Sequence, residues 1–220
     1  MKQSLSSATP NQRRDRTDGS CCVIGLAEVC QREGIVFDSS LQRMLETDFC
    51  KRNSLGRNWL NLSTFDISSF LILEYHHPLK MLLIWTNQVI QGCENSHKEQ
   101  NIQWSQLSAL FKLFKSELEL HLAKEEIMLF PSLHAIERGQ QTIFGDLNDL
   151  QQATLSMQDE SLKASMLLKE ITCTCKNICF QNERCSAFSL LLFLLNRIAK
   201  LLRMSCYIRD AAILPRILSA

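Results

Sequence analysis

Residues 104–133 read WSQLSALFKLFKSELELHLAKEEIMLFPSL, and this stretch decides the fold class of the chain. Its apolar residues recur every three or four positions, which is the spacing that places side chains on one face of an α-helix. The members of this face are Leu107, Leu110, Phe114, Leu118 and His121. The 220 residues include 7 glycines and 4 prolines, and this scarcity favours long helices over a turn-rich β fold.

The same period recurs in three other stretches, so we predict helices near residues 66–90, 104–133, 146–171 and 186–214. Polar segments separate them at residues 91–100, after Pro131 and around residues 173–184. Four amphipathic helices joined in this way are typical of a four-helix bundle. We therefore predict an all-α protein whose main domain is a four-helix bundle over residues 59–220.

The first 58 residues differ from the bundle in composition. Residues 1–20 are polar and rich in Ser, Arg, Asp and Gln, so we expect a disordered leader. Residues 21–58 contain weak helical stretches, and we expect a small helical module that carries Cys21 and Cys22. These neighbouring thiols are too strained to form a structural disulfide, but they are candidates for reactive thiols that carry iron or nitrosyl groups.

Charge and hydropathy argue against two classes of partner. The 24 basic and 23 acidic residues nearly balance, so no overall field attracts nucleic acid or an anionic membrane. The most apolar run, residues 188–195, is too short to span a bilayer and is followed by charged residues. Residues 1–20 do not resemble an export signal, so we expect a cytoplasmic protein with reduced thiols.

His121 and Glu125 are the leading candidates for a chemical site. They are four residues apart, so they share a helix face, and that face is the apolar one. A carboxylate in a core is costly unless it is paired, protonated or bound to a cation. Iron or another divalent metal would satisfy both groups, and the alternative is a hydrogen-bonded core histidine. Glu126, the next residue, is assigned to the solvated face.

All 5 histidines lie between residues 76 and 134. His76 and His77 point about 100° apart on a helix, so at most one of them faces the core. His97 falls in a loop, where solvent exposure is expected unless the loop folds over the bundle end. A separate cluster consists of Cys173, Cys175, Cys179 and Cys185. Four thiolates suit zinc or an iron–sulfur cluster, but the spacing matches no strong template, and unpaired loop thiols are favoured.

The run HLAKEEIMLFP at residues 121–131 has a counterpart, SCYIRDAAILP, at residues 205–215. The apolar spacing and the final proline recur, which indicates duplication of a two-helix unit. Ser205 then corresponds to His121, and Arg209 corresponds to Glu125. The second unit therefore retains the scaffold without the candidate ligands.

The H-x-x-x-E-E-x-x-L-F-P pattern at 121–131 resembles the signature helix of the iron–sulfur cluster repair di-iron proteins, which belong to the hemerythrin-like superfamily. Three other segments agree with this family in order: residues 21–34 with their Cys-Cys pair, residues 65–77, and MQDES at 157–161. The resemblance spans roughly residues 21–215. It implies a hemerythrin-like four-helix bundle after a small N-terminal module, non-haem iron, and a role in repairing iron–sulfur clusters damaged by nitric oxide or oxidative stress.

The resemblance also implies a ligand set. The positions carried over, or able to adapt as ligands, are His76, His77, His97, His121, Glu125 and Glu160. Ser161, Ser205 and Arg209 stand where the family has two histidines and a second bridging glutamate. Arg209 would place a permanent cation where an iron is expected. One iron, two irons, or an ion pair of Arg209 with Glu125 or Glu160 in place of metal are therefore alternatives.

Three functions follow from these alternatives. The first is repair of iron–sulfur clusters, with damaged iron–sulfur proteins as partners and labile iron delivered through Cys21 and Cys22. The second is a non-catalytic sensor or binding protein for nitric oxide or oxygen. The third is a metal-free, pseudo-di-iron bundle. The sequence leaves open whether the chain acts as a monomer or as a homodimer.

Overall fold

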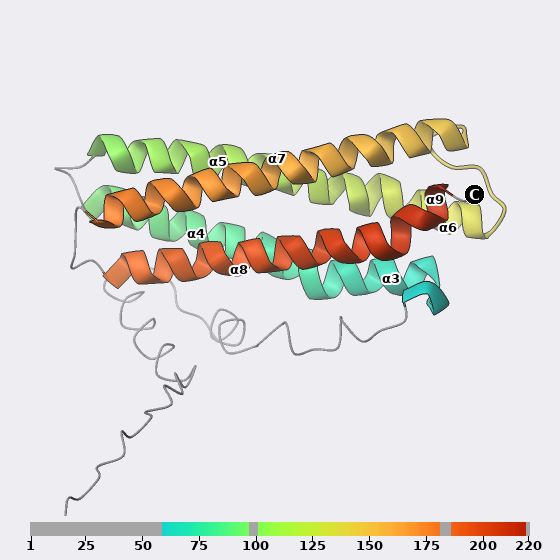
Figure 1. Ribbon diagram of the computed structural model, residues 1–220, viewed down its shortest axis with the longest axis horizontal. Helices are drawn as coiled ribbons and strands as arrows, with labels where there is room; N and C mark the ends of the chain where they lie inside the picture. Colours follow the sequence, from blue (N-terminus) through green and yellow to red (C-terminus); the bar gives the residue numbers. More distant parts are fainter. Residues whose placement is uncertain (1–58, 97–100, 181–185, 219–220) are drawn as a thin grey trace, which may run out of the picture.

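The computed structural model describes residues 59–96, 101–180 and 186–218, and they form the predicted all-α four-helix bundle (Figure 1). A short 3-10 turn, η1 (Trp59–Asn61), precedes four helical bodies. They are α3 (Thr64–Leu71), η2 (Ile72–His76) and α4 (His77–Ser96); α5 (Asn101–Lys124), η4 (Glu125–Leu129) and α6 (Phe130–Glu137); α7 (Leu147–Phe180); and α8 (Ser186–Ile208), η5 (Arg209–Ile213) and α9 (Leu214–Leu218). The predicted N-terminal module, including Cys21 and Cys22, lies outside the described residues.

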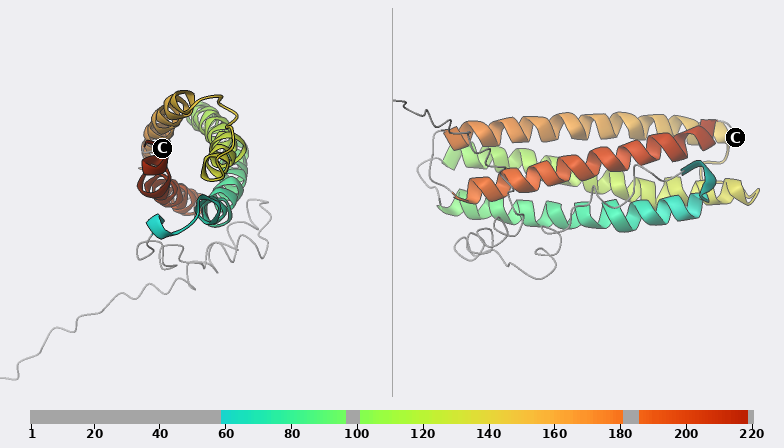
Figure 2. Two further views of the ribbon diagram at one scale, coloured as in Figure 1. Left: turned by 90° about the vertical axis from the view of Figure 1, so that its right-hand side faces the viewer. Right: turned by 60° about the horizontal axis from the view of Figure 1, so that its bottom comes forward.

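Successive bodies run in opposite directions along the bundle (Figure 1). Helix α5 packs against α4 and α7, and α8 packs against the same two helices, so the four bodies enclose one core (Figure 2). Trp104, Phe111 and Phe114 of α5 are fully buried there, and the ring of Trp104 lies 5.1 Å from that of Phe188 on α8. Phe111, rather than the half-buried Leu110, completes the core-facing row of α5.

Three of the four bodies contain a π-helical turn in the same setting. The turns η2, η4 and η5 each end two residues before a helical proline: Pro78, Pro131 and Pro215. A proline ring clashes with the carbonyl four residues earlier in a regular α-helix. In each turn the residue before the proline instead donates its N–H to the carbonyl five residues earlier, which widens the helix locally.

The π turns support the predicted duplication and position the candidate site. Turn η4 begins at Glu125 and η5 begins at Arg209, which are the residues that the internal alignment pairs. Turn η2 ends at His76. Three buried polar residues are therefore placed by three equivalent irregular turns, a type of distortion that is frequent at functional sites.

The third helix is longer than predicted. Helix α7 continues to Phe180, so the prediction of a cysteine-rich loop from residue 173 is wrong up to that point. Ile171, Cys175 and Ile178 follow at helical spacing and are all buried, which explains why the helix persists.

In the part of the chain that the structure describes, no helix is long and apolar enough to cross a membrane.

Hydrogen bonds fix the bundle end at which α3, α6 and α9 meet (Figure 1). Ser63 caps α3 by accepting a hydrogen bond from the N–H of Asp66. Glu137 of α6 accepts hydrogen bonds from the backbone N–H and the hydroxyl of Thr64, at 3.0 and 2.7 Å. Arg216 of α9 donates to Glu137 and to the carbonyl of Trp59. These contacts hold the three π-containing bodies in register beside the site.

Candidate functional site

A buried ion pair occupies the centre of the bundle at the level of the π turns. Nη1 of Arg209, from η5, donates to Oε1 of Glu125, from η4, at 2.8 Å. Both side chains are only 3% exposed. The other carboxylate oxygen of Glu125 lies 3.1 Å from Nε2 of His76, at the end of η2. Glu125 therefore sits between an arginine and a histidine supplied by two other helical bodies.

Ser161 and His121 complete the environment of the guanidinium. Nη1 of Arg209 also donates to the hydroxyl of Ser161, on α7, at 2.8 Å. That hydroxyl lies 3.0 Å from Nε2 of His121, and the same nitrogen is 3.3 Å from Arg209 and from Glu125. Every one of the four bodies thus contributes a side chain to one buried cluster, which we call the central cluster: His76, His121, Glu125, Ser161 and Arg209.

A partly exposed layer of ion pairs surrounds the central cluster. Glu126 accepts from Nδ1 of His76 at 2.9 Å and from Lys80 at 2.8 Å. On another side, Glu160 lies 3.3 Å from Nδ1 of His121 and accepts from Lys124 at 2.5 Å. Each histidine therefore has one ring nitrogen toward the central cluster and the other toward a carboxylate that a lysine neutralises.

Neighbouring charges keep both members of the buried ion pair, Glu125 and Arg209, charged. Burial by itself raises the pKa of a carboxyl group, but contacts with His121 and His76 and the charge of Arg209 together hold the pKa of Glu125 well below its usual range. Burial likewise disfavours the guanidinium, but Glu125, with smaller contributions from Cys206 and Asp210, outweighs burial and raises the pKa of Arg209. Arg209 is therefore a permanent internal cation, and Glu125 is its anion.

The carboxylates around His76 reverse the effect of burial on that side chain. Burial lowers the pKa of an imidazole, but the contacts and charges of Glu125 and Glu126 together raise the pKa of His76 above 6.5. The hydrogen bond from His76, opposed by burial and assisted by Lys80, lowers the pKa of Glu126 to about 2. The two carboxylates therefore favour the protonated form of His76.

The position of Glu126 corrects the sequence interpretation. A solvated carboxylate was expected there, but the side chain is only 21% exposed and pairs with both His76 and Lys80. An ideal helix would carry this residue away from His76. Turn η4 begins at Glu125, and in this widened turn two consecutive glutamates reach the two nitrogens of one imidazole.

The stability of the fold is expected to be greatest between about pH 4.5 and 6.5. The pKa of Glu126 is lowered from 4.5 to about 2, so its contribution is present above pH 4.5 and is lost as the pH falls toward 2. The pKa of His76 is raised from 6.5, so its contribution is complete below pH 6.5 and is lost as the pH rises through the higher folded value.

Melting temperatures measured from pH 3 to 9 test this expectation. Glu126→Gln should flatten the acid side of the profile, while Glu117→Gln, at an exposed position of α5, should leave its shape unchanged. A wild-type melting temperature that rises steadily up to pH 9 would contradict the assigned role of His76.

The central cluster does not fit the two-iron centre that the resemblance implies. Nη1 of Arg209 contacts both Glu125 Oε1 and His121 Nε2, at 2.8 and 3.3 Å, and so takes the place where these two potential metal ligands would hold a cation. An iron there would meet a permanent positive charge. Among the described residues, no group of three or more His, Cys, Asp or Glu side chains is arranged to hold a metal ion.

The remaining candidate ligands separate into three groups. His121, Glu125, His76 and Glu160 meet at or beside the central cluster. His77 is exposed and does not join them, because it is rotated from the buried His76 by one helical position. His97, Cys21, Cys22 and Cys185 lie outside the described residues.

Cys173 and Cys175 on α7 do not converge. Cys173 is exposed, whereas Cys175 is buried in the core, so these two thiols point in different directions. Cys206, one turn before Arg209 on α8, is half-buried, and burial raises the pKa of its thiol although the charge of Arg209 opposes this. A neutral thiol beside a guanidinium is a poor metal ligand.

Sequence reasoning missed Lys80, Lys124 and Glu126 as parts of the site. Lys80 is four residues after His76, and Lys124 precedes Glu125, so both are close in sequence to recognised candidates. Their partners, however, lie on other helices, 46 and 36 residues away in sequence. Helical spacing places residues on a face but does not identify the partner across the bundle.

No model of a known protein family matches the chain.

Proposed function

We propose that this protein is a metal-independent, non-enzymatic relative of the iron–sulfur cluster repair di-iron proteins. Its bundle would then serve as a scaffold that binds a partner rather than as a catalyst. One observation carries the proposal: the guanidinium of Arg209 contacts Glu125, Ser161 and His121 simultaneously at the centre of the bundle. The charge that a metal would supply in such a bundle is then supplied by a side chain, and it cannot dissociate or change oxidation state.

The outer ion pairs support the same proposal. Lys80 and Lys124 each neutralise a carboxylate that contacts a site histidine. With Arg209 beside Glu125, each carboxylate of the site has a cationic partner on the chain itself. A buried carboxylate without a cation would be costly, and this network removes that cost without a metal.

Cluster repair itself is the second candidate function, and His76 is the observation that favours it. Its Nε2 is buried and lies 3.1 Å from Glu125 Oε2 without hydrogen-bond geometry, while its Nδ1 is paired with Glu126. A histidine that ligates a metal commonly has its other nitrogen held by a carboxylate in this way. Iron would then be held by His76 and Glu125, and damaged iron–sulfur proteins would be the partners.

Metal analysis of the full-length protein separates the two candidates. The chain is produced in iron-supplemented culture, purified without chelator under reducing conditions, and analysed for iron and zinc. We expect much less than one metal ion per chain and an unchanged melting temperature after treatment with a chelator, because no metal contributes to folding. The protein should not restore activity to a nitric-oxide-damaged [4Fe–4S] enzyme.

Iron binding at His76 is the result that would contradict metal independence. One iron per chain that is lost in His76→Ala, but retained in the exposed His77→Ala, would overturn metal independence and support the repair function. His77 is a matched control because it is the adjacent histidine on the same helix and faces solvent.

A further inference from the structure

Helix α5 carries a row of uncharged side chains on the face opposite its core-facing row. The row, which we call the α5 seam, consists of Gln106, Ala109, Leu113, Ser116, Leu120 and Ala123. Leu113 is 50% exposed and Leu120 is 58% exposed, and no member of the row is charged. Solvent-facing rows of this kind on a helix often mark an interaction surface.

The seam has the spacing of a coiled-coil contact. Its members alternate steps of three and four residues, which is the repeat that brings two helices together along one line. From Gln106 to Ala123 the seam is about 26 Å long at the rise of an α-helix. The partner that fits it best is therefore another helix with the same spacing.

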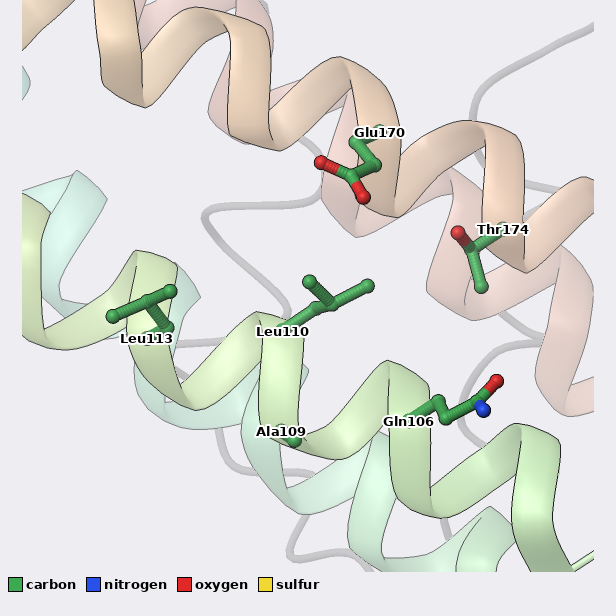
Figure 3. Close-up of a pocket in the computed structure, with 6 residues that line it drawn as sticks. All are labelled: Gln106, Ala109, Leu110, Leu113, Glu170 and Thr174. Atoms are coloured by element: carbon green, nitrogen blue, oxygen red, sulfur yellow. The ribbon is translucent and has the colours of Figure 1, made fainter.

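Grooves between α5 and α7 border the seam and give side chains of a partner somewhere to fit. One open groove of about 520 Å³ is lined by Gln106, Ala109, Leu110 and Leu113 from α5 and by Glu170 and Thr174 from α7 (Figure 3). A smaller one of about 230 Å³ combines Leu120 and Ala164 with the charged side chains of Glu117, Lys124, Glu160 and Lys163. Leu113 and Leu120 each form part of a groove wall.

We propose that the α5 seam is a dimer interface in which the α5 helices of two copies of this chain pack antiparallel about a two-fold axis. In this arrangement Leu113 faces the partner's Ser116, Leu120 faces the partner's Ala109, and Gln106 faces the partner's Ala123. Each layer pairs a large side chain with a small one, which allows close and even packing. Such a self-complementary contact closes a symmetric dimer.

A parallel pairing of the same seam fits less well. Each residue would then face its own copy, so Leu113 would meet Leu113 and Ser116 would meet Ser116. Bulky layers would alternate with layers that leave a gap, and unfilled gaps are costly at an interface. The order of sizes along the seam therefore favours the antiparallel pair.

Flanking charges are also complementary in the antiparallel pair. Lys112 and Glu119 lie seven residues apart beside the seam, on the same side of it. About the proposed axis, Lys112 of each copy approaches the partner's Glu119. Within its own chain Glu119 also pairs with Lys115 at 2.8 Å, so it is already oriented on this surface. Such pairs at the rim specify register and orientation more than affinity.

Helix α7 provides a comparison surface that lacks this uniform character. Leu155, Leu162 and Met166 are exposed at similar spacing, but Asp159 and Lys169 interrupt the row. Leu162 is 61% exposed, close to the value for Leu120, so substitution of either costs the folded monomer little.

The α5 seam does not include the central cluster, so a dimer at the seam does not depend on whether that cluster binds metal.

Sedimentation equilibrium and light scattering on the full-length protein test the interface. We expect a species of about twice the chain mass of 25.3 kDa at micromolar concentration. Leu120→Glu and Leu113→Glu should each weaken dimerisation by roughly 100-fold, because each change occurs twice in a symmetric pair. Leu162→Glu should leave the dimer intact, and circular dichroism should show unchanged helix content in all three variants.

A charge exchange tests the orientation. Lys112→Glu should weaken the dimer, and the double variant Lys112→Glu with Glu119→Lys should restore it, because the facing charges are again opposite. In a parallel pair Lys112 would face the partner's Glu117, and the double variant would not recover.

Several results would overturn the proposal. They are a wild-type monomer at about 100 µM, far above the dissociation constants of stable dimers; a dimer that survives Leu120→Glu; and a dimer that Leu162→Glu disrupts. A photo-crosslinker at position 120 that reacts with residues 1–58 of its own chain would overturn it as well.

Discussion

Arg209→Met is expected to lower the free energy of unfolding by about 3–5 kcal/mol at pH 7, which is the usual effect of removing one partner from a buried ion pair. The substitution removes the donor to Oε1 of Glu125 and to the hydroxyl of Ser161. Glu125 would remain only 3% exposed with no permanent cation beside it. Chemical denaturation followed by circular dichroism measures the loss.

Two further variants assign the loss to the ion pair rather than to a change of volume. Arg203→Met removes an exposed arginine from the same helix and should change stability by less than about 0.5 kcal/mol. Arg209→Met combined with Glu125→Leu removes both charges and should recover most of the stability, because an apolar pair of similar volume can replace a buried ion pair. If the double variant is no more stable than Arg209→Met alone, the pair is not the source of the loss.

If Arg209 takes the place of a metal as proposed, Arg209→Ala is expected to create a divalent metal site at Glu125 and His121. The substitution vacates the position beside Glu125 Oε1 and His121 Nε2, which are 3.3 Å apart. Two donors at this separation can both lie about 2.1 Å from one zinc ion. The buried carboxylate also loses its cation, so metal binding would restore the charge balance. Titration calorimetry should show zinc binding at least about tenfold tighter than to the wild type.

The origin of the new site is tested by adding and removing ligands in the Arg209→Ala variant. Ser161→His should tighten zinc binding further, because Ser161 Oγ lies 3.0 Å from His121 Nε2 and an imidazole there can reach the same ion. Glu125→Gln should abolish binding. Zinc should also raise the melting temperature of Arg209→Ala but not that of the wild type, since a ligand that binds the folded state stabilises it. Equal zinc binding by wild type and variant would refute the idea that Arg209 takes the place of a metal.

The helices and the core-facing row of α5 could be predicted from the sequence because their determinants are local. Residues such as Leu107, Phe114 and Leu118 repeat with the helical period, and all three are buried. The continuation of α7 through Cys175 was missed because a cluster of cysteines and polar residues was interpreted as a loop. In that segment burial of every third or fourth residue outweighs composition.

Half of the candidate site could be predicted in the same way. The spacing of His121 and Glu125 fixed their common face. The alignment of residues 121–131 with 205–215 paired Arg209 with Glu125, so a cation stands where the second unit would have a ligand. The ligand set implied by the resemblance left Glu125 and Glu160 as alternative partners for Arg209. The structure selects Glu125, at 2.8 Å, and pairs Glu160 with Lys124 instead.

His121 and Glu125 thus illustrate what each level of information decides. The sequence by itself determined that both residues face the interior, because the helical period is a property of consecutive residues. The tertiary structure alone decided that a guanidinium, a serine hydroxyl and a second histidine converge on them. The physical reason is that partners on different helices meet only when packing and the three π turns set the rotation of each helix about its axis, and residue spacing within one helix carries no information about that rotation.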